Sequence, residues 1–272
     1  MVKGNSIQIG LKDVQGVYSG AEAKLWEMVM GEQIHVGGFA ESMVLAQKAG
    51  IKKGDKVLDL CSALGGGLRF LVKNFGIQGF GVDGTENMVN EARKRAVEEN
   101  LGDRIEFRLA DVQDVPWPDE TFDVVWGEDA WCYVADKERL ISEAARLLKK
   151  GGTLAFSDWI EGSQGLTDAE AERICDNSLG MTFPYMESQK GYEKLIAKYG
   201  LQLVSSEDLN DHFAEMIDLY INILTKQLLY DALRIVGDNM EFFQAKGAEM
   251  AFWLEMAKAK KFSRGRWIAR KL

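Results

Sequence analysis

The fold is decided by one stretch of the chain, Lys56-Val57-Leu58-Asp59-Leu60-Cys61-Ser62-Ala63-Leu64-Gly65-Gly66-Gly67. Its short apolar run predicts a buried strand over 56–60, and its glycines predict a tight turn that opens a helix near Leu68. The N–H groups at the start of such a helix point toward a bound ligand. A second predicted strand at 78–82 ends at Asp83, 24 positions after Asp59 (83 − 59 = 24). In nucleotide-binding βαβ units an acidic side chain at a spacing of roughly 20 residues reaches a ribose.

Strands and helices alternate outward from this stretch, which predicts a parallel sheet with helices on both faces. Asp136 is placed to cap one of these helices. The predicted elements are strands at 105–109, 122–126 and 153–158 and helices at 21–30, 40–49, 68–75, 86–99 and 136–148.

The pattern changes after Trp159. Thr167-Asp168-Ala169-Glu170 is a capping box that starts a helix, as Ser19-Gly20-Ala21-Glu22 is near the N-terminus. The basic stretch 258–271 is interpreted as a solvated helix end followed by an edge strand. We expect the N-terminal helices and the segment after Trp159 to cover the strand ends as a lid. The remaining predicted elements are helices at 188–199, 211–236 and 239–260 and strands at 201–206 and 266–270.

The composition argues against several classes of protein. A formal net charge of −9 disfavours a nucleic acid partner, whose phosphates need a positive surface. Three cysteines without CxxC spacing indicate a reducing compartment, and with no signal peptide expected, a cytoplasmic location is predicted. Two histidines leave no credible zinc site, so no metal is expected. The sequence contains no run of about 18 apolar residues, so no membrane span is expected.

The order Val-Leu-Asp-x-x-x-x-x-Gly-Gly-Gly from Val57, followed by Ala110-Asp111-Val112 and Phe122-Asp123-Val124-Val125-Trp126, resembles class I S-adenosylmethionine-dependent methyltransferases. A dehydrogenase turn would instead be Gly-x-Gly-x-x-Gly. Further segments resemble the sarcosine/dimethylglycine methyltransferases and the phosphoethanolamine methyltransferases. These segments are Tyr18, Gly31-Glu32-Gln33-Ile34-His35-Val36-Gly37-Gly38 and Glu128-Asp129-Ala130-Trp131. The resemblance is good over 18–160 and loose over the C-terminal third.

This resemblance implies a Rossmann-like class I methyltransferase fold, α/β, with a mostly parallel seven-stranded sheet, helices on both faces and a helical lid. A single domain over 1–272 is expected, with cap helices at 18–50, a cofactor-binding core at 51–160 and lid helices at 161–200 and 211–260. The implied cofactor is S-adenosylmethionine. The implied activity is N-methylation of a small amine such as sarcosine or dimethylglycine, by a monomer or homodimer.

The resemblance also implies a set of cofactor contacts. Asp83 would hold the ribose hydroxyls, Asp111 would accept from the adenine amino group, and Asp59 would face the methionine part. Trp26 is equally well explained as a core residue of an amphipathic helix, and His35 could be a structural histidine. The predicted cofactor-binding residues are Trp26, His35, Asp59, Cys61, Gly65, Asp83, Gly84, Asp111, Val112 and Glu128.

The chain departs from the family at the turn. The usual Gly-x-Gly is Cys61-Ser62-Ala63, which adds a Cβ at two positions where the backbone approaches the ligand. Cys61 would place a thiol beside the sulfonium.

Three residues are predicted to be catalytic by resemblance: Tyr18, Asp129 and Tyr133. Tyr18 matches a tyrosine that closes over the site in relatives. Asp129 suits recognition of a cation or work as a base, with helix capping as the alternative. Tyr133 stands where phosphoethanolamine enzymes have a histidine.

Aromatic side chains in the expected lid could cage a methylated ammonium, or could form the lid's own core. The predicted substrate-binding residues are Trp131, Trp159 and Tyr185, with Phe183 beside them. Between Trp159 and Gly191 only two residues are basic, which disfavours a phosphorylated substrate. A carboxylated amine fits better, although no partner for its carboxylate is identified.

Two other functions remain open. The chain could methylate another small nucleophile, namely phosphoethanolamine, a thiol or arsenite. Cys61, Cys132 and Cys175 could bind a soft species such as arsenite, since thiolates are soft ligands. A protein that binds the cofactor without catalysis is the other alternative.

Overall fold

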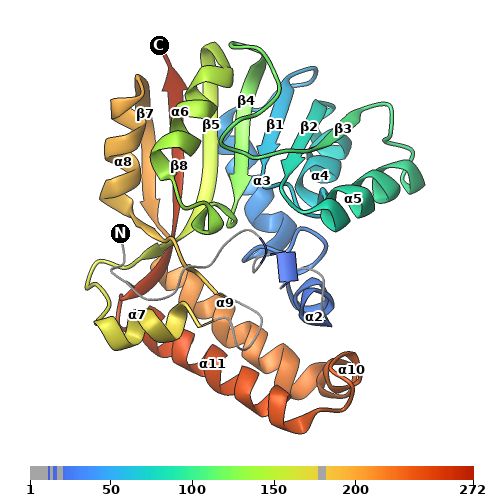
Figure 1. Ribbon diagram of the computed structural model, residues 1–272, viewed down its shortest axis with the longest axis vertical. Coiled ribbons are helices and arrows are strands. Elements are labelled where there is room, and N and C mark those ends of the chain that lie inside the picture. Colours follow the sequence, from blue (N-terminus) through green and yellow to red (C-terminus); the bar gives the residue numbers. More distant parts are fainter. Residues whose placement is uncertain (1–11, 13–14, 17–20, 177–181) are drawn as a thin grey trace.

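The computed structural model describes residues 12, 15–16, 21–176 and 182–272. Its described part contains a mixed, mostly parallel sheet of eight strands, in the order β3-β2-β1-β4-β5-β8-β7, with β6 paired to β5 (Figure 1). The strands are β1 (Lys56–Leu60), β2 (Gln78–Asp83), β3 (Ile105–Leu109), β4 (Phe122–Glu128), β5 (Leu148–Glu161), β6 (Glu187–Ser188), β7 (Leu201–Asp208) and β8 (Phe262–Lys271). The seven predicted strands are confirmed, and the two-residue β6 is additional.

The helices follow the predicted order closely. Asp136 caps α6 by accepting from the Arg139 N–H, and the capping box of Thr167 and Glu170 is present at the start of α7. The helix expected over 211–236 is divided by a short π-helical segment, Ile223–Gln227. The α-helices are α2 (Ala21–Met30), α3 (Gly38–Ala49), α4 (Gly66–Phe75), α5 (Glu86–Glu98), α6 (Lys137–Leu147), α7 (Asp168–Ile174), α8 (Gln189–Lys198), α9 (Asn210–Asn222), α10 (Leu229–Ile235) and α11 (Met240–Lys258).

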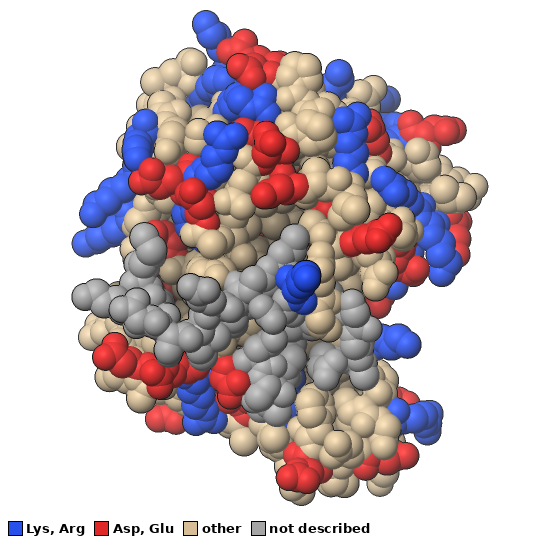
Figure 2. All heavy atoms as spheres, viewed as in Figure 1, with Lys and Arg blue, Asp and Glu red and all other residues tan. Residues whose placement is uncertain are grey.

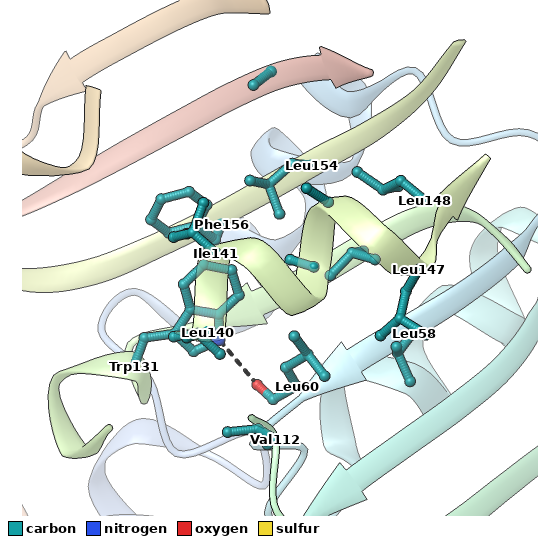
Figure 3. Packing of buried hydrophobic residues seen from close by; sticks show 14 of the residues in the cluster. Leu58, Leu60, Val112, Trp131, Leu140, Ile141, Leu147, Leu148, Leu154 and Phe156 are labelled. Atoms are coloured by element: carbon teal, nitrogen blue, oxygen red, sulfur yellow. Dashed lines mark hydrogen bonds between the residues drawn. The ribbon is translucent and has the colours of Figure 1, made fainter. Parts of the chain in front are cut away.

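Helices cover both faces of the sheet because the central strands are apolar on both sides. From Val57 to Leu60 every residue of β1 is buried, as expected for a strand covered on two faces. Helices α3, α4 and α5 pack on one face. Helices α6 and α8 pack on the other, where Leu140 and Ile141 of α6 meet Leu58 and Leu60 of β1 (Figure 3).

A separate helical layer lies beyond the end of the sheet. Its helices α2, α7, α9, α10 and α11 share a hydrophobic core that also takes in Trp159 of β5 and Phe262 of β8. In Figure 1, α7, α9, α10 and α11 lie below the sheet, on the side toward which β4 points. The layer therefore faces the carboxyl ends of the parallel strands, where ligands bind in open α/β sheets.

Strand β8 corrects one prediction. It lies between β5 and β7 and pairs antiparallel with both, so it is not an edge strand. Arg264 and Arg266 within it are only 1% and 4% exposed. The basic C-terminal stretch is thus partly buried, because its arginines have carboxylate partners inside the protein.

The surface carries both signs of charge. Figure 2 shows acidic and basic side chains interspersed over the upper part of the visible face. None of the described helices is both long and apolar enough to cross a bilayer.

Candidate functional site

Two neighbouring cavities lie at the carboxyl ends of the strands. The larger has a volume of about 550 Å³ and the smaller about 30 Å³. They share Cys61, Ala63 and Ala130 in their walls. The loops after β1, β2, β3 and β4 form most of the larger cavity. The topology of the sheet therefore brings the ends of four strands together at one site.

Most of the predicted site residues come together here. Those that line the larger cavity are Cys61, Asp83, Gly84, Asp111, Val112, Tyr133 and Tyr185. Those that line the smaller one are Asp59, Cys61, Glu128 and Asp129.

Asp83 is held at the end of β2 by backbone donors. Its two carboxylate oxygens accept from the N–H groups of Ala63, at 2.9 Å, and Thr85, at 2.8 Å. Burial raises the pKa of Asp83, and these two hydrogen bonds oppose the rise. Asp111 is exposed at the end of β3 and accepts from the Gln113 N–H at 2.8 Å. The larger cavity therefore has one fixed buried carboxylate and one solvated carboxylate on its wall.

The turn after β1 adopts an unusual backbone at both departures from the family pattern. Cys61 has φ 68° and Ala63 has φ 43°, in the left-handed region that glycine adopts freely. The conformation costs non-glycine residues roughly 1–2 kcal/mol each. Burial raises the pKa of the Cys61 thiol well above its usual value, and the Asp83 and Asp59 carboxylates add to the rise. Cys61 is therefore a protonated thiol on the wall of both cavities.

The three glycines of the turn approach protein groups. A Cβ at Gly65, the residue before α4, would lie 2.4 Å from the Phe107 ring. A Cβ at Gly66 would lie 2.9 Å from the Gln33 backbone nitrogen, and Gln33 itself lines the smaller cavity. A Cβ at Gly67 would lie 3.1 Å from Glu128 Oε2. Gly66 thus lets the 31–38 loop pack closely against the turn, and Gly67 leaves room for Glu128 beside the smaller cavity.

The smaller cavity is acidic. Burial raises the pKa of Asp59 well above its usual value, and the nearby Glu128 and Asp83 carboxylates raise it further. Glu128 Oε2 accepts from Trp126 Nε1 at 3.0 Å, whereas Oε1 is buried and receives no hydrogen bond within the described residues. Buried carboxylates without enough donors favour a cation.

His35 lies behind this cavity and does not line it. Its Nδ1 faces the Val36 carbonyl at 3.2 Å, and a carbonyl can only accept, so Nδ1 carries a proton. Its Nε2 lies 2.9 Å from Ser42 Oγ and 3.2 Å from Glu128 Oε1. His35 is therefore not among the lining residues of either cavity, and it contacts Glu128, which lines the smaller one.

Asp129 has all of its acceptor positions occupied. Arg264 Nε lies 2.7 Å from each of its carboxylate oxygens, which also accept from Ser157 Oγ at 2.8 Å and from the Val36 N–H at 3.0 Å. Burial would raise the pKa of Asp129, but Arg264 and His35 outweigh burial and lower it. Asp129 is therefore a fixed anion, which leaves it poorly suited to accept a proton as a base.

The three tryptophans that were predicted to bind the cofactor or the substrate are not among the residues that line these two cavities. Trp26 is buried and stacks on Trp253 with ring centroids 6.0 Å apart. Trp131 Nε1 donates to the Leu60 carbonyl at 3.1 Å, within the core between the sheet and α6 (Figure 3). Trp159 Nε1 donates to the Asp129 carbonyl at 3.0 Å. The core interpretation therefore describes all three, and of the expected aromatic cage only Tyr185 reaches the larger cavity.

The predictions for Tyr18 and for the cysteines remain. Tyr18 lies outside the described residues. Cys132 and Cys175 are buried, and burial raises the pKa of both thiols. Among the described residues no cluster of three or more His, Cys, Asp or Glu side chains could hold a metal ion. A thiol-based site for a soft metalloid has no support in this geometry.

Sequence reasoning missed several residues of the site, above all Arg264. Its partner Asp129 lies 135 positions earlier, so no local pattern joins them. The only available signal was a pair of arginines at alternate positions, Arg264 and Arg266, of which Arg266 begins the predicted strand 266–270. The residues that line the cavities and were not predicted include Gln33, Ile34, Thr85, Met88 and Leu109.

Comparisons with known proteins find methyltransferases. Residues 58–156 match a protein family described as a methyltransferase domain. A sterol 24-C-methyltransferase of Eremothecium gossypii is 29% identical over 195 residues, which are 71% of this chain and 52% of that protein.

Two solved structures have a similar shape. A phosphoethanolamine N-methyltransferase 2 of Haemonchus contortus, in complex with phosphomonomethylethanolamine and S-adenosylhomocysteine, has a TM-score of 0.84 at 21% identity. The match covers 97% of this chain and 61% of that one. A putative sarcosine dimethylglycine methyltransferase of Galdieria sulphuraria has a TM-score of 0.80 at 20% identity, covering 92% of this chain and 97% of that one. The chain thus spans about half to three fifths of two of these relatives.

Proposed function

We propose that this chain, a member of the class I S-adenosylmethionine-dependent methyltransferases, transfers a methyl group to the nitrogen of a small amine. One observation carries the proposal. Among the described residues, the charged side chains that line the larger cavity are Asp83 and Asp111, both acidic. No Lys or Arg is among these lining residues, so the cavity offers no counter-charge to a phosphate or another anion, which favours an amine as the acceptor.

The residues present fit the cofactor. Asp83 and Asp111 offer acceptors for ribose hydroxyls and an amino group, and Met88, Leu109 and Val112 supply apolar surface for a flat ring. In the smaller cavity, Asp59 and the undonated Oε1 of Glu128 suit an ammonium group such as that of the methionine part. When bound, S-adenosylmethionine supplies an electrophilic methyl group on a sulfonium.

We assign the acceptor to the other end of the larger cavity. Ala130, Tyr133, Val134, Ala135 and Tyr185 line that end, so it is apolar apart from two phenols. Catalysis there depends on holding the nitrogen in line with the methyl group and on excluding water. The amine must arrive unprotonated, and Asp129 is already paired with Arg264. The phenols orient the amine, and solvent takes its proton.

Sarcosine and dimethylglycine are the first acceptors to test. No Lys or Arg is among the described residues that line the cavity, so the amine end is better matched than the carboxylate. The panel therefore includes methylaminoethanol and dimethylaminoethanol, which have the same amines without an anion, and phosphoethanolamine.

Isothermal titration with S-adenosylmethionine followed by mass spectrometry of the products tests the proposal. We expect cofactor binding and a product 14 mass units heavier from at least one amine, the change expected for each added methyl group. Binding without any methylated amine would refute N-methylation and favour the non-catalytic alternative.

A second candidate is an apolar acceptor with a hydroxyl or carbon nucleophile. The apolar wall of Ala130, Val134 and Ala135 favours it, and the sterol methyltransferase is one of the relatives. A sterol and a phenolic acceptor in the same assay distinguish the two candidates.

A further inference from the structure

A buried ion pair joins the last strand to the loop that carries the site. Arg264 of β8 is 1% exposed and pairs in register with Trp159 of β5. Its Nε contacts both oxygens of Asp129, its Nη2 donates to Ser157 Oγ at 3.1 Å, and its Nη1 reaches Glu41 Oε2 at 3.3 Å. The guanidinium thus bridges α3, β5 and the end of β4.

Asp129 adopts a conformation that it would not adopt on its own. Its φ is 55°, in the left-handed region that costs a non-glycine residue roughly 1–2 kcal/mol. The backbone is fixed at both ends, since its N–H donates to the Ser157 carbonyl at 2.9 Å and its carbonyl accepts from Trp159 Nε1. The side chain is fixed by Arg264. These contacts hold the strained residue in place.

The direction of the chain after Asp129 determines both cavities. The next residue, Ala130, lines the two of them, and Tyr133 lines the larger. Asp129 also accepts from the Val36 N–H, which fixes the loop whose residues Gln33 and Ile34 line the smaller cavity. One carboxylate therefore fixes two walls of the site.

We propose that Arg264 is a positioning residue for methyl transfer, which acts through Asp129 to hold the Ala130–Tyr133 wall against the acceptor. It lines neither cavity, so it is not an anion-binding residue for the substrate. Asp83 takes its hydrogen bonds from Ala63 and Thr85, so the ribose end of the cofactor site is expected to depend much less on Arg264.

Arg264→Lys is the informative variant. A lysine keeps the positive charge, but its single ammonium cannot face Asp129, Ser157 and Glu41 at once, as the three nitrogens of the guanidinium do. Arg266→Lys is the matched control, because Arg266 is on the same strand, similarly buried, and paired with Glu41 and Glu207 without contacting Asp129.

The first measurement needs no acceptor and is independent of the proposed function. Backbone hydrogen exchange followed by mass spectrometry should rise at least about tenfold in peptides covering 129–134 and 33–37 in Arg264→Lys. The Kd for adenosine, which lacks the methionine part and so tests only the Asp83 end of the site, should rise less than about threefold. Arg266→Lys should leave both values near those of the parent protein.

The second measurement rests on the proposed function. With an amine that the parent protein methylates, kcat/KM for the amine, measured at saturating cofactor, should fall at least about tenfold in Arg264→Lys. If Arg264→Lys does not fold, Asp129→Asn replaces it, because Glu41 still faces the arginine in that variant. Equal effects of Arg264→Lys and Arg266→Lys, or parent-like exchange in Arg264→Lys or Asp129→Asn, would overturn the proposal.

Discussion

Asp158 is a buried carboxyl group that makes folding stability depend on pH. It lies on β5 with no exposed surface and accepts from the Cys132 N–H at 3.0 Å and the Tyr192 hydroxyl at 2.7 Å. Burial raises the pKa of Asp158 to about 7, although Lys137 and the two hydrogen bonds lower it. In the unfolded chain the pKa of an Asp is about 3.9.

Between those two pKa values the folded state binds more protons than the unfolded state. The contribution of Asp158 to the free energy of unfolding is therefore fully present below about pH 4 and is lost as pH rises toward 7. Each pH unit in this window corresponds to about 1.4 kcal/mol. From pH 5 to pH 8, the titration of Asp158 should lower the free energy of unfolding by about 2–3 kcal/mol.

Asp158→Asn removes this titration. We expect the stability of the variant relative to the parent protein to increase by about 2–3 kcal/mol from pH 5 to pH 8. Urea denaturation at pH 5, 6, 7 and 8 measures the difference, with m-values compared to verify that the same transition is followed. Tyr192→Phe is the control: it keeps the carboxyl group but removes a hydrogen bond that lowers the pKa of Asp158, so its stability should fall from pH 5 to pH 8 at least as much as that of the parent protein. A difference between Asp158→Asn and the parent that does not change over this range would refute the reasoning.

Four other substitutions test the packing and the site. Gly127→Ala should lower the free energy of unfolding by about 3 kcal/mol, because the new Cβ would lie 2.4 Å from Trp131 Nε1 and displace the indole from its hydrogen bond. Thermal denaturation measures this effect, and a Tm equal to that of the parent protein would contradict it. Gly247→Ala, in α11 with no described atom within 4 Å of the new Cβ, should instead stabilise by about 1 kcal/mol, and a lowered Tm would count against it. Asp83→Ala should raise the Kd for S-adenosylmethionine at least about tenfold by titration, and an unchanged Kd would remove Asp83 from the site. Cys61→Gly, at φ 68°, should keep that Kd within about threefold, whereas a large loss would give the thiol a role.

The fold could be predicted from the sequence to a large extent because its signals are local. The apolar run at 56–60, the glycine turn and the capping residues Asp136 and Thr167 each depend on neighbours a few positions away. Carboxylates at the ends of β1 and β2 also follow from chain order, since parallel strands bring their carboxyl ends to one edge. These signals predicted Asp59, Asp83 and Asp111 at the site, the family resemblance added Val112, and all four line the cavities.

The predictions that fared less well concern the direction of side chains. Trp26, Trp131 and Trp159 were predicted at the site from residue type and family resemblance, and neither of these gives the direction of a side chain. Whether an indole turns toward a cavity or into a core depends on what packs against it, and here Trp253 and the Leu60 carbonyl lie far away along the chain.

The sequence by itself determined the doubly covered sheet, the turn after its first strand and the acidic residues at the strand ends, because periodicity and chain order encode them. Only the tertiary structure decided that Asp129 is a fixed anion and that Arg264 is buried beside it. The two residues meet across 135 positions of sequence. A buried charge is tolerated only where another element supplies its counter-charge, and that pairing exists only after the last strand has entered the sheet.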